Sequence, residues 1–359
     1  MDFDRPIGLT ASKGSFGSRI VVSWVALPKA KMYHLYRFDE ETQEYAKLVE
    51  TADTTFTDIT AKSALKKVFY KLMVYNSKTE YSKFSDVAYG YTTGQSYSKA
   101  FSFGSEGTGV GQFKYAMHIE TDAVGNIYVS DEEVGRVQKF DSTGKFLEIF
   151  FSGSGARGIA FLRNGGSIVT RTQSSSYVLV RDAQKKVVKE WGTYGTGINQ
   201  FQNIEEIAVD DDQNIYIVDG ISNLVKKFDQ TGKLLVQFSG GIRTEMQHDA
   251  ASAYGICYFN EKIFVTSGRN SIVRIFDKNG KFLKSWDTGF NNGAIKSYGN
   301  SIFISGAGFV LKTDENGEVR ELIGQGVFGG PTPGLAIGKN GDLIVSDLYS
   351  EKIVVFKQL

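Results

Sequence analysis

The sequence is poor in cysteine, proline, long apolar runs and net charge. It has one cysteine and four prolines among 359 residues. A single cysteine, Cys257, excludes an internal disulfide, and its apolar surroundings (GICYF, 255–259) predict a small buried core residue. No segment reaches the roughly eighteen apolar residues that a membrane-spanning helix needs. Lysine plus arginine number 41 and aspartate plus glutamate 40, so charge balance gives no reason to expect binding to nucleic acid or anionic membranes.

The remaining composition is that of a turn-rich, mostly β protein. Aromatic residues make up 13% of the chain, and it has 40 glycines. A chain of this length is too long for one ordinary core and predicts two domains. It opens Met-Asp-Phe-Asp-Arg-Pro without a basic-then-apolar leader, so we expect either a cytosolic protein or one whose signal has been removed.

Short apolar–polar alternations recur through the second part of the chain, separated by turns rich in glycine and aspartate. The segment FDSTGKFL at 140–147 returns as FDQTGKLL at 228–235 and as FDKNGKFL at 276–283. A second segment, NIYVSD at 126–131, has five further copies that start 39 to 48 residues apart, at positions 167, 214, 262, 301 and 342. A period of about forty residues with four alternating strands is typical of a β-propeller blade.

The strands expected in the first and last copies predict how the ring closes. In the first copy four strands are expected, at His118–Thr121, Ile127–Ser130, Arg136–Phe140 and Lys145–Phe150. In the last copy only three are expected, at Gly334–Gly338, Asp342–Asp347 and Lys352–Phe356. An outer strand without a blade, Tyr97–Phe103, precedes the first copy. We predict that it completes the last blade, joining both chain ends of a six-bladed ring and removing an open sheet edge.

Glycine-rich runs precede two of the expected blades. They read GTGVGQF at 107–113 and GTGINQF at 195–201. Together with the GNIYV core and the FDxxGK turn, these runs resemble NHL repeats over residues 97–359. Because the glycines precede a strand rather than open a helix, they do not indicate a nucleotide-binding loop.

The first part of the chain, residues 1–93, has no repeat copy. Its alternating runs predict seven strands, at Ile7–Ser12, Ile20–Val25, Tyr33–Phe38, Tyr45–Glu50, Thr54–Asp58, Phe69–Tyr75 and Phe84–Tyr91. Such spacing is typical of a small sandwich. The segments 19–38 and 68–86 resemble a fibronectin type III domain, with Trp24 at the family's buried tryptophan and Val68 where a tyrosine is usual. The resemblance implies a spacer, joined through Gly90–Ser98 to a propeller at 94–359.

Candidate binding residues lie in the loops of the rim through which propellers usually bind. Those loops join strand two to strand three, and strand four to the next blade. Aromatic and arginine side chains with mixed charge suit a protein or peptide partner. The candidates, with the aromatic ones expected to be exposed, are Tyr115, Arg157, Arg171, Tyr177, Tyr194, Arg243, Arg269, Phe290, Phe309, Phe328 and Tyr349.

A metal-dependent lyase or hydrolase is the alternative function. His118 and Glu206 stand where other copies have glycine before the first-strand isoleucine, near the channel mouth. With Asp131 and Asp219 they form a candidate cation site of imidazole and carboxylate ligands. The propeller segment has only two histidines, which excludes a zinc site built from three.

RNA binding, which some NHL propellers perform, is a weaker alternative. Residues 94–359 carry 28 basic and 29 acidic side chains, a formal charge of −1. Single-stranded RNA needs phosphate neutralisation as well as stacking, so nucleic acid is not the expected partner. No G-x-S-x-G nucleophile motif occurs either.

The sequence therefore predicts an all-β, non-enzymatic binding or scaffold protein without a cofactor. The expected partner is a protein, a peptide or a component of the cell envelope. The order of the two domains resembles that of bacterial envelope and secreted proteins, which implies a periplasmic, lipid-anchored or secreted location. The sequence leaves the oligomeric state open.

Overall fold

The computed structural model describes residues 5–13, 19–28, 30–58, 60, 67–77, 80–92, 96–172, 177–240, 252–268 and 270–359. Every regular element in these ranges is a β-strand. The chain divides into two units, one of Met1–Ser96 with Val319–Ile323, the other of Tyr97–Glu318 with Gly324–Leu359. No helix in the described ranges is long and apolar enough to span a membrane.

The N-terminal unit consists of two sheets packed around a core. One sheet has the order β1-β2-β5; the other has the order β4-β3-β6-β7, with β8 paired to β6. The strands are β1 (Thr10–Ala11), β2 (Ile20–Ser23), β3 (Met32–Asp39), β4 (Glu44–Thr51), β5 (Thr55–Asp58), β6 (Val68–Ser77), β7 (Glu80–Tyr81) and β8 (Ala88–Gly90). Alternate residues of β2, β3 and β6 point inward, and Trp24 is buried among them.

The last strand expected in this unit, Phe84–Tyr91, is wrong in its extent. Only β8 falls within it, and the segment between β7 and β8 pairs with β6 irregularly, through the amides of Ser82 and Ser85 to the carbonyls of Val74 and Leu72 (3.0 and 2.8 Å). The hydroxyl of Ser82 accepts a hydrogen bond from the amide of Val74 (2.9 Å), and that of Ser85 accepts one from the amide of Leu72 (2.9 Å). Because serine hydroxyls replace backbone carbonyls here, β6 keeps its hydrogen bonds without a continuous partner strand.

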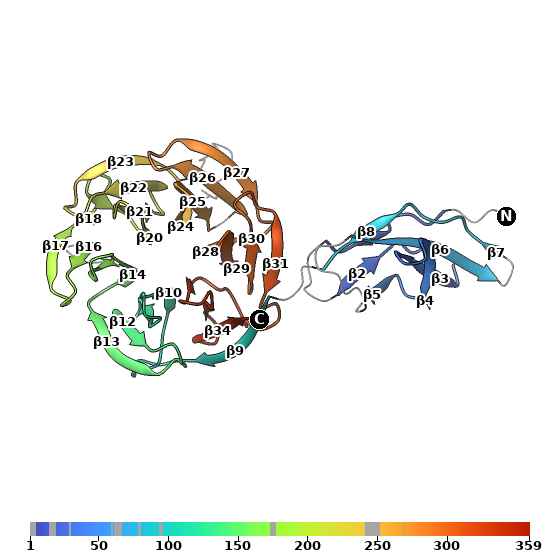
Figure 1. The fold of residues 1–359 in the computed structure, drawn as a ribbon, viewed down its shortest axis with the longest axis horizontal. Coiled ribbons are helices and arrows are strands. Elements are labelled where there is room, and N and C mark those ends of the chain that lie inside the picture. Colours follow the sequence, from blue (N-terminus) through green and yellow to red (C-terminus); the bar gives the residue numbers. More distant parts are fainter. Residues whose placement is uncertain are drawn as a thin grey trace. The chain divides into compact units, whose positions relative to one another are not determined.

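The second unit, completed by Val319–Ile323, is a ring of antiparallel four-stranded sheets (Figure 1). Within each sheet the strands follow sequence order from the centre outward, except that β9 is the outermost strand of the last sheet. The strands, sheet by sheet, are β10 (Ala116–Thr121), β11 (Ile127–Asp131), β12 (Arg136–Phe140) and β13 (Phe146–Ser152); β14 (Ala156–Phe161), β15 (Ser167–Arg171), β16 (Val178–Arg181) and β17 (Val187–Trp191); β20 (Ile204–Val209), β21 (Ile215–Asp219), β22 (Leu224–Phe228) and β23 (Leu234–Ser239); β24 (Ala253–Phe259), β25 (Lys262–Ser267), β26 (Ile272–Asp277) and β27 (Phe282–Asp287); β28 (Asn292–Tyr298), β29 (Ser301–Gly306), β30 (Val310–Thr313) and β31 (Val319–Ile323); and β32 (Leu335–Ile337), β33 (Leu343–Asp347), β34 (Lys352–Gln358) and β9 (Tyr97–Phe103). Each innermost strand contacts the next, and β32 contacts β10, so the ring is closed.

The predicted closure by Tyr97–Phe103 is confirmed. Strand β9 pairs antiparallel with β34, from Phe103 opposite Ile353 to Tyr97 opposite Gln358. The first strand of the ring therefore completes the sheet built by the end of the chain, and neither is left with an open edge.

The recurrent FDxxGK turns position neighbouring sheets. In the first turn, the Asp141 carboxylate accepts hydrogen bonds from the amides of Thr143 and Lys145 (2.8 and 3.1 Å). Gly144 has a φ of +84°, and a Cβ there would lie 2.6 Å from the ring of Phe103 on β9. Glycine is thus required both by the backbone and by the aromatic ring packed on it.

The glycine-rich runs form folded loops on one rim. Gln112 accepts a hydrogen bond from the Gly109 amide (2.9 Å), and Gln200 accepts the same bond from Gly197 (2.9 Å). The second loop contains a short parallel pair, β18 (Thr193–Tyr194) with β19 (Gln200–Phe201). Because the terminal phenylalanine of each run is fully buried, these loops are fixed parts of the rim.

Candidate functional site

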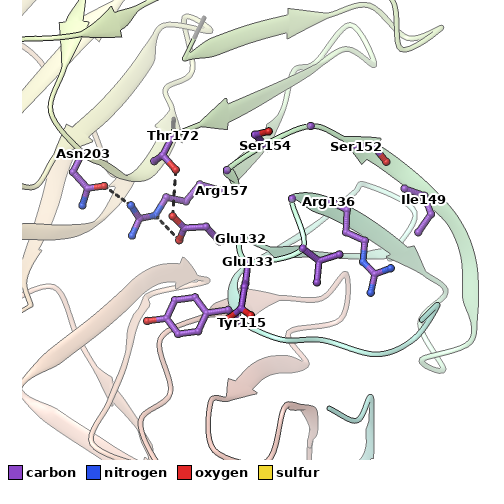
Figure 2. Close-up of a pocket in the computed structure, with 14 residues that line it drawn as sticks. Tyr115, Glu132, Glu133, Arg136, Ile149, Ser152, Ser154, Arg157, Thr172 and Asn203 are labelled. Carbon is purple, nitrogen blue, oxygen red and sulfur yellow. Dashed lines mark hydrogen bonds and ion pairs between the residues drawn. The ribbon is translucent and has the colours of Figure 1, made fainter. Parts of the chain in front are cut away.

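A cavity of about 1070 Å³ opens on this rim, between the β11–β12 loop and the start of β14 (Figure 2). Its polar lining comes from three consecutive sheets and includes Tyr115, Glu132, Glu133, Arg136, Arg157, Thr172 and Asn203. A volume of this size is at the upper end of that of small-molecule sites. The cavity is therefore large enough for a small ligand or for one or two side chains of a partner.

Arg157 lies at the centre of the polar wall, at the start of β14. Its guanidinium donates to Asn203 Oδ1 (2.5 Å), and one Nη lies 3.0 Å from Glu205 Oε2. Its Nε lies 3.4 Å from Glu132 Oε2, and Glu132 in turn accepts from the hydroxyl of Thr172 (3.3 Å). Figure 2 shows Arg157 held between Asn203 and Glu132. One cation on the second sheet therefore joins carboxylates from the sheets on either side of it.

The charged side chains that line the cavity are balanced, with Glu132 and Glu133 against Arg136 and Arg157. Burial raises the pKa of Glu205, and Arg157 beside it opposes that rise. Glu132 is half-buried against Arg157, whereas Glu133 next to it is exposed. Tyr115, 38% exposed, lies beside these carboxylates (Figure 2). At the opening, the carboxylate of Glu133 and the ring of Tyr115 are thus accessible to solvent. Behind them, Arg157 is paired with Glu132 and Glu205.

The channel contains a second group of ionisable side chains, carried by the innermost strands. Nδ1 of His118 on β10 lies 3.5 Å from Oε2 of Glu206 on β20, and both side chains are buried. Burial would raise the pKa of Glu206, but Lys296 and then His118 overcome it and hold that pKa at about 2. Lys296 also pairs with Glu120 (3.0 Å). Although burial disfavours its charge, Glu120 and Glu206 raise the pKa of Lys296.

The predicted cation ligands do not all meet. The structure brings His118 and Glu206 together, but Asp131 and Asp219 serve the rim loops instead. Asp131 accepts hydrogen bonds from the backbone amides of Lys114 and Tyr115, and Asp219 accepts from those of residues 202 and 203. Among the residues the structure describes, no three His, Cys, Asp or Glu side chains are grouped to hold a metal ion.

The predicted rim residues fall into different environments. Tyr194 (67% exposed) and Tyr349 (74% exposed) are open to solvent, and Tyr115 and Arg157 belong to the cavity. The predicted exposure of Tyr177 is wrong. This side chain, only 5% exposed, lies just before β16 and stacks on Phe201 of the folded glycine-rich loop (ring centroids 6.4 Å apart).

The other predicted rim residues lie away from the cavity. Phe290 and Phe309 pack edge-to-face on each other (4.7 Å), and Phe328 packs on Phe356 (5.7 Å); all three predicted phenylalanines are half-buried. Arg171 is also half-buried. Arg243 and Arg269 lie outside the described residues.

Sequence reasoning did not single out Glu205, Asn203, Glu120 or Lys296. A signal for Glu205 was present, because two successive glutamates in the apolar strand IEEIAV place one carboxylate on each face. Lys296 is likewise a charge within an apolar strand, NGAIKSY. Burial of Cys257 was predicted and is confirmed, since it is 5% exposed and burial raises its thiol pKa to about 12.

No known family model matches the chain, and no curated protein is similar to it in sequence. Similar solved structures do exist. A protein of unknown function from Bacteroides thetaiotaomicron has a TM-score of 0.57 at 13% identity, over 99% of both chains. A streptogramin B lyase has a TM-score of 0.52 at 14% identity, over 93% of this chain and all of that one. A gluconolactonase from Xanthomonas campestris has a TM-score of 0.56 at 13% identity, over 70% of this chain and 88% of that one. These neighbours are of the β-propeller type, and at such identities the likeness shows the fold alone.

Proposed function

We propose that the protein is a non-enzymatic binding module that uses the rim cavity around Arg157 to hold a basic segment of a protein or peptide. The observation that carries this proposal is the carboxylate of Glu133, which is exposed at the cavity opening. The two arginines that line the cavity are already engaged: Arg157 pairs with Glu132 and Glu205, and Arg136 donates hydrogen bonds to backbone carbonyls of the glycine-rich loop. A positively charged side chain entering the cavity would meet Glu133 and the ring of Tyr115. Ion pairing and cation–π attraction both favour it there.

We infer that the scaffold is a six-bladed NHL-type propeller preceded by a fibronectin type III-like spacer. The repeated glycine-rich runs and the closure by β9 support the first assignment. The arrangement of the N-terminal strands in two sheets, one containing β1-β2-β5 and the other β4-β3-β6, supports the fibronectin type III-like assignment. We also propose an extracytoplasmic bacterial location, which rests only on the resemblance of this domain order to envelope proteins.

The binding proposal is tested with the full chain and a panel of labelled peptides of equal length that are basic, neutral or acidic. Fluorescence polarisation should show the basic peptides binding most tightly. Glu133→Gln should weaken that binding about tenfold, equivalent to about 1.4 kcal/mol. The matched control is Glu190→Gln, an exposed glutamate on outer strand β17, which should leave binding unchanged. Equal binding of all three classes, or equal losses in both variants, would refute the proposal.

A second candidate, a metal-dependent lyase or hydrolase, rests on the buried pair His118–Glu206. Neither ring nitrogen of His118 has a hydrogen-bond partner among the described residues, while Glu206 is held ionised. Metal analysis, followed by thermal-shift titration with EDTA, calcium, magnesium and zinc, tests it. A stoichiometric ion that stabilises the chain and is lost in His118→Ala would favour the enzyme; no ion and no shift would remove this candidate.

A further inference from the structure

The outward face of the larger sheet in the N-terminal unit carries an unusual row of aromatic rings. In an antiparallel pair, directly opposed residues share one face of the sheet. Tyr36 on β3 is opposite Lys71 on β6, and Phe69 on β6 is opposite Tyr89 on β8. Tyr70 and the alternate residues of β6 point into the core. Phe69 and Lys71, which lie on either side of Tyr70 in the strand, must therefore face outward. We call Tyr36, Tyr45, Lys67, Lys71, Phe84 and Tyr89, together with Lys13 whose ammonium lies over the ring of Tyr89, the aromatic–lysine face.

The rings of this face pack against one another at steep angles. Tyr36 and Phe84 meet edge-to-face (5.0 Å, 85°), as do Phe38 and Tyr45 (5.2 Å, 61°). Phe84 is 36% exposed although it is a large apolar side chain. Ring edges and tyrosine hydroxyls, rather than open ring planes, are therefore presented to solvent.

Lysine ammonium groups cover the ring planes. Lys71 Nζ lies 4.0 Å from the centre of Tyr45, and Lys67 and Lys13 lie 4.6 and 4.4 Å from the centre of Tyr89. Within the described part of the chain, none of these three lysines has a carboxylate partner. Cation–π attraction holds the ammonium groups in place but leaves their full positive charge available to an anion.

We propose that the aromatic–lysine face binds an acidic polysaccharide, such as a chain of uronic acid residues. Carboxylates along the polymer would pair with the three lysines. Its hydroxyl groups would hydrogen-bond to the tyrosine hydroxyls, and its C–H groups would pack on the ring edges. A single-stranded nucleic acid fits less well, because bases stack on open ring planes, and lysines already cover the planes of Tyr45 and Tyr89.

The test is titration calorimetry of the full chain with an oligogalacturonate of about eight sugars. A ligand of this size is long enough to reach along the face, because typical strands are about 17–20 Å long. We expect binding that weakens as salt is raised, because the paired charges are exposed. Replacing Lys13, Lys67 and Lys71 together by glutamine should weaken binding about tenfold or more, which corresponds to at least about 1.4 kcal/mol. The matched control replaces three exposed lysines of the propeller turns, Lys145, Lys233 and Lys281, and should bind as the unmodified protein does.

Competing ligands give the remaining outcomes. A neutral oligosaccharide of equal length should bind much more weakly than the oligogalacturonate. Tighter binding of oligothymidylate would assign the face to single-stranded nucleic acid, and equally tight binding of oligoglutamate would reduce it to an unspecific anion surface; either result overturns the proposal. So would absence of oligogalacturonate binding at low salt, or an equal loss in the control variant. Because these lysines lie outside the propeller cavity, the peptide and polysaccharide experiments succeed or fail separately.

Discussion

An Nη atom of Arg157 lies 3.0 Å from Oε2 of Glu205, and both side chains are almost completely buried. The pair connects the innermost strands of two neighbouring sheets, and Glu132 extends the network to a third. Removing one partner of a buried ion pair leaves an uncompensated charge in a medium of low polarity. The network therefore forms the cavity wall and supports the ring at the same time.

Arg157→Met is expected to lower the free energy of unfolding by about 3 kcal/mol, because Glu132 and Glu205 lose their shared cation. Urea unfolding near neutral pH measures this change. The matched control is Arg163→Met, whose pair with Asp211 is exposed and should contribute less than about 1 kcal/mol. Equal effects of the two substitutions would contradict a buried network.

Asp131→Ala and Asp219→Ala should each destabilise the protein by about 2 kcal/mol. Each carboxylate is fully buried and accepts hydrogen bonds from two backbone amides of a rim loop, which would then lack an acceptor. Thermal unfolding with EDTA or with added calcium should give the same loss. A loss that appears only with the metal present would instead assign these residues to a cation site.

Gly232→Ala should be more harmful than an ordinary glycine replacement in a turn. The φ of Gly232 is +84°, and a Cβ there would lie 2.9 Å from the ring of Trp191 in the preceding sheet. The left-handed backbone alone costs about 1 kcal/mol, and overpacking adds about 1–3 kcal/mol. Gly289→Ala is the control, because its φ is +80° with no atom within 4 Å. If both variants lose equal stability, the aromatic contact contributes nothing.

The stability of the N-terminal unit should depend on Asp58 at acidic pH. Burial acts to raise the pKa of Asp58, but hydrogen bonds from Thr60, Tyr70 and Arg37 together lower it. A lowered carboxyl pKa stabilises the fold above the unfolded value of about 4, and this contribution is lost as the pH falls through the lower folded value.

Asp58→Asn should therefore cost about 2 kcal/mol near neutral pH, and progressively less as the pH falls below about 4. Urea unfolding over a pH series measures this. Tyr70→Phe removes only the hydrogen bond donated to Asp58 and should give a smaller loss with the same pH dependence. A loss that does not vary with pH would show that the Asp58 charge is not involved.

The alternation of apolar and polar residues was sufficient to predict most strands of the ring. It placed the strands of the first sheet to within a few residues, because each pattern is local and bounded by turns whose aspartate and glycine have defined roles. Counting the strands of the last repeat also predicted the pairing of Tyr97–Phe103 with the end of the chain. Irregular pairing was not predictable in this way, as the interruption at Ser82 and Ser85 shows.

The candidate site depended much more on the tertiary structure. From sequence, His118 and Glu206 could be placed at equivalent positions of two repeats, and the structure brings them to 3.5 Å. The burial of Arg157, the inward turn of Tyr177 and the approach of Lys296 to the channel depend on side chains that belong to different sheets. Which of these meet is decided by the rotation of each sheet about the axis and by the loops between them. The repeat pattern thus determined the ring and its turns, whereas long-range packing alone decided which charges face one another across it.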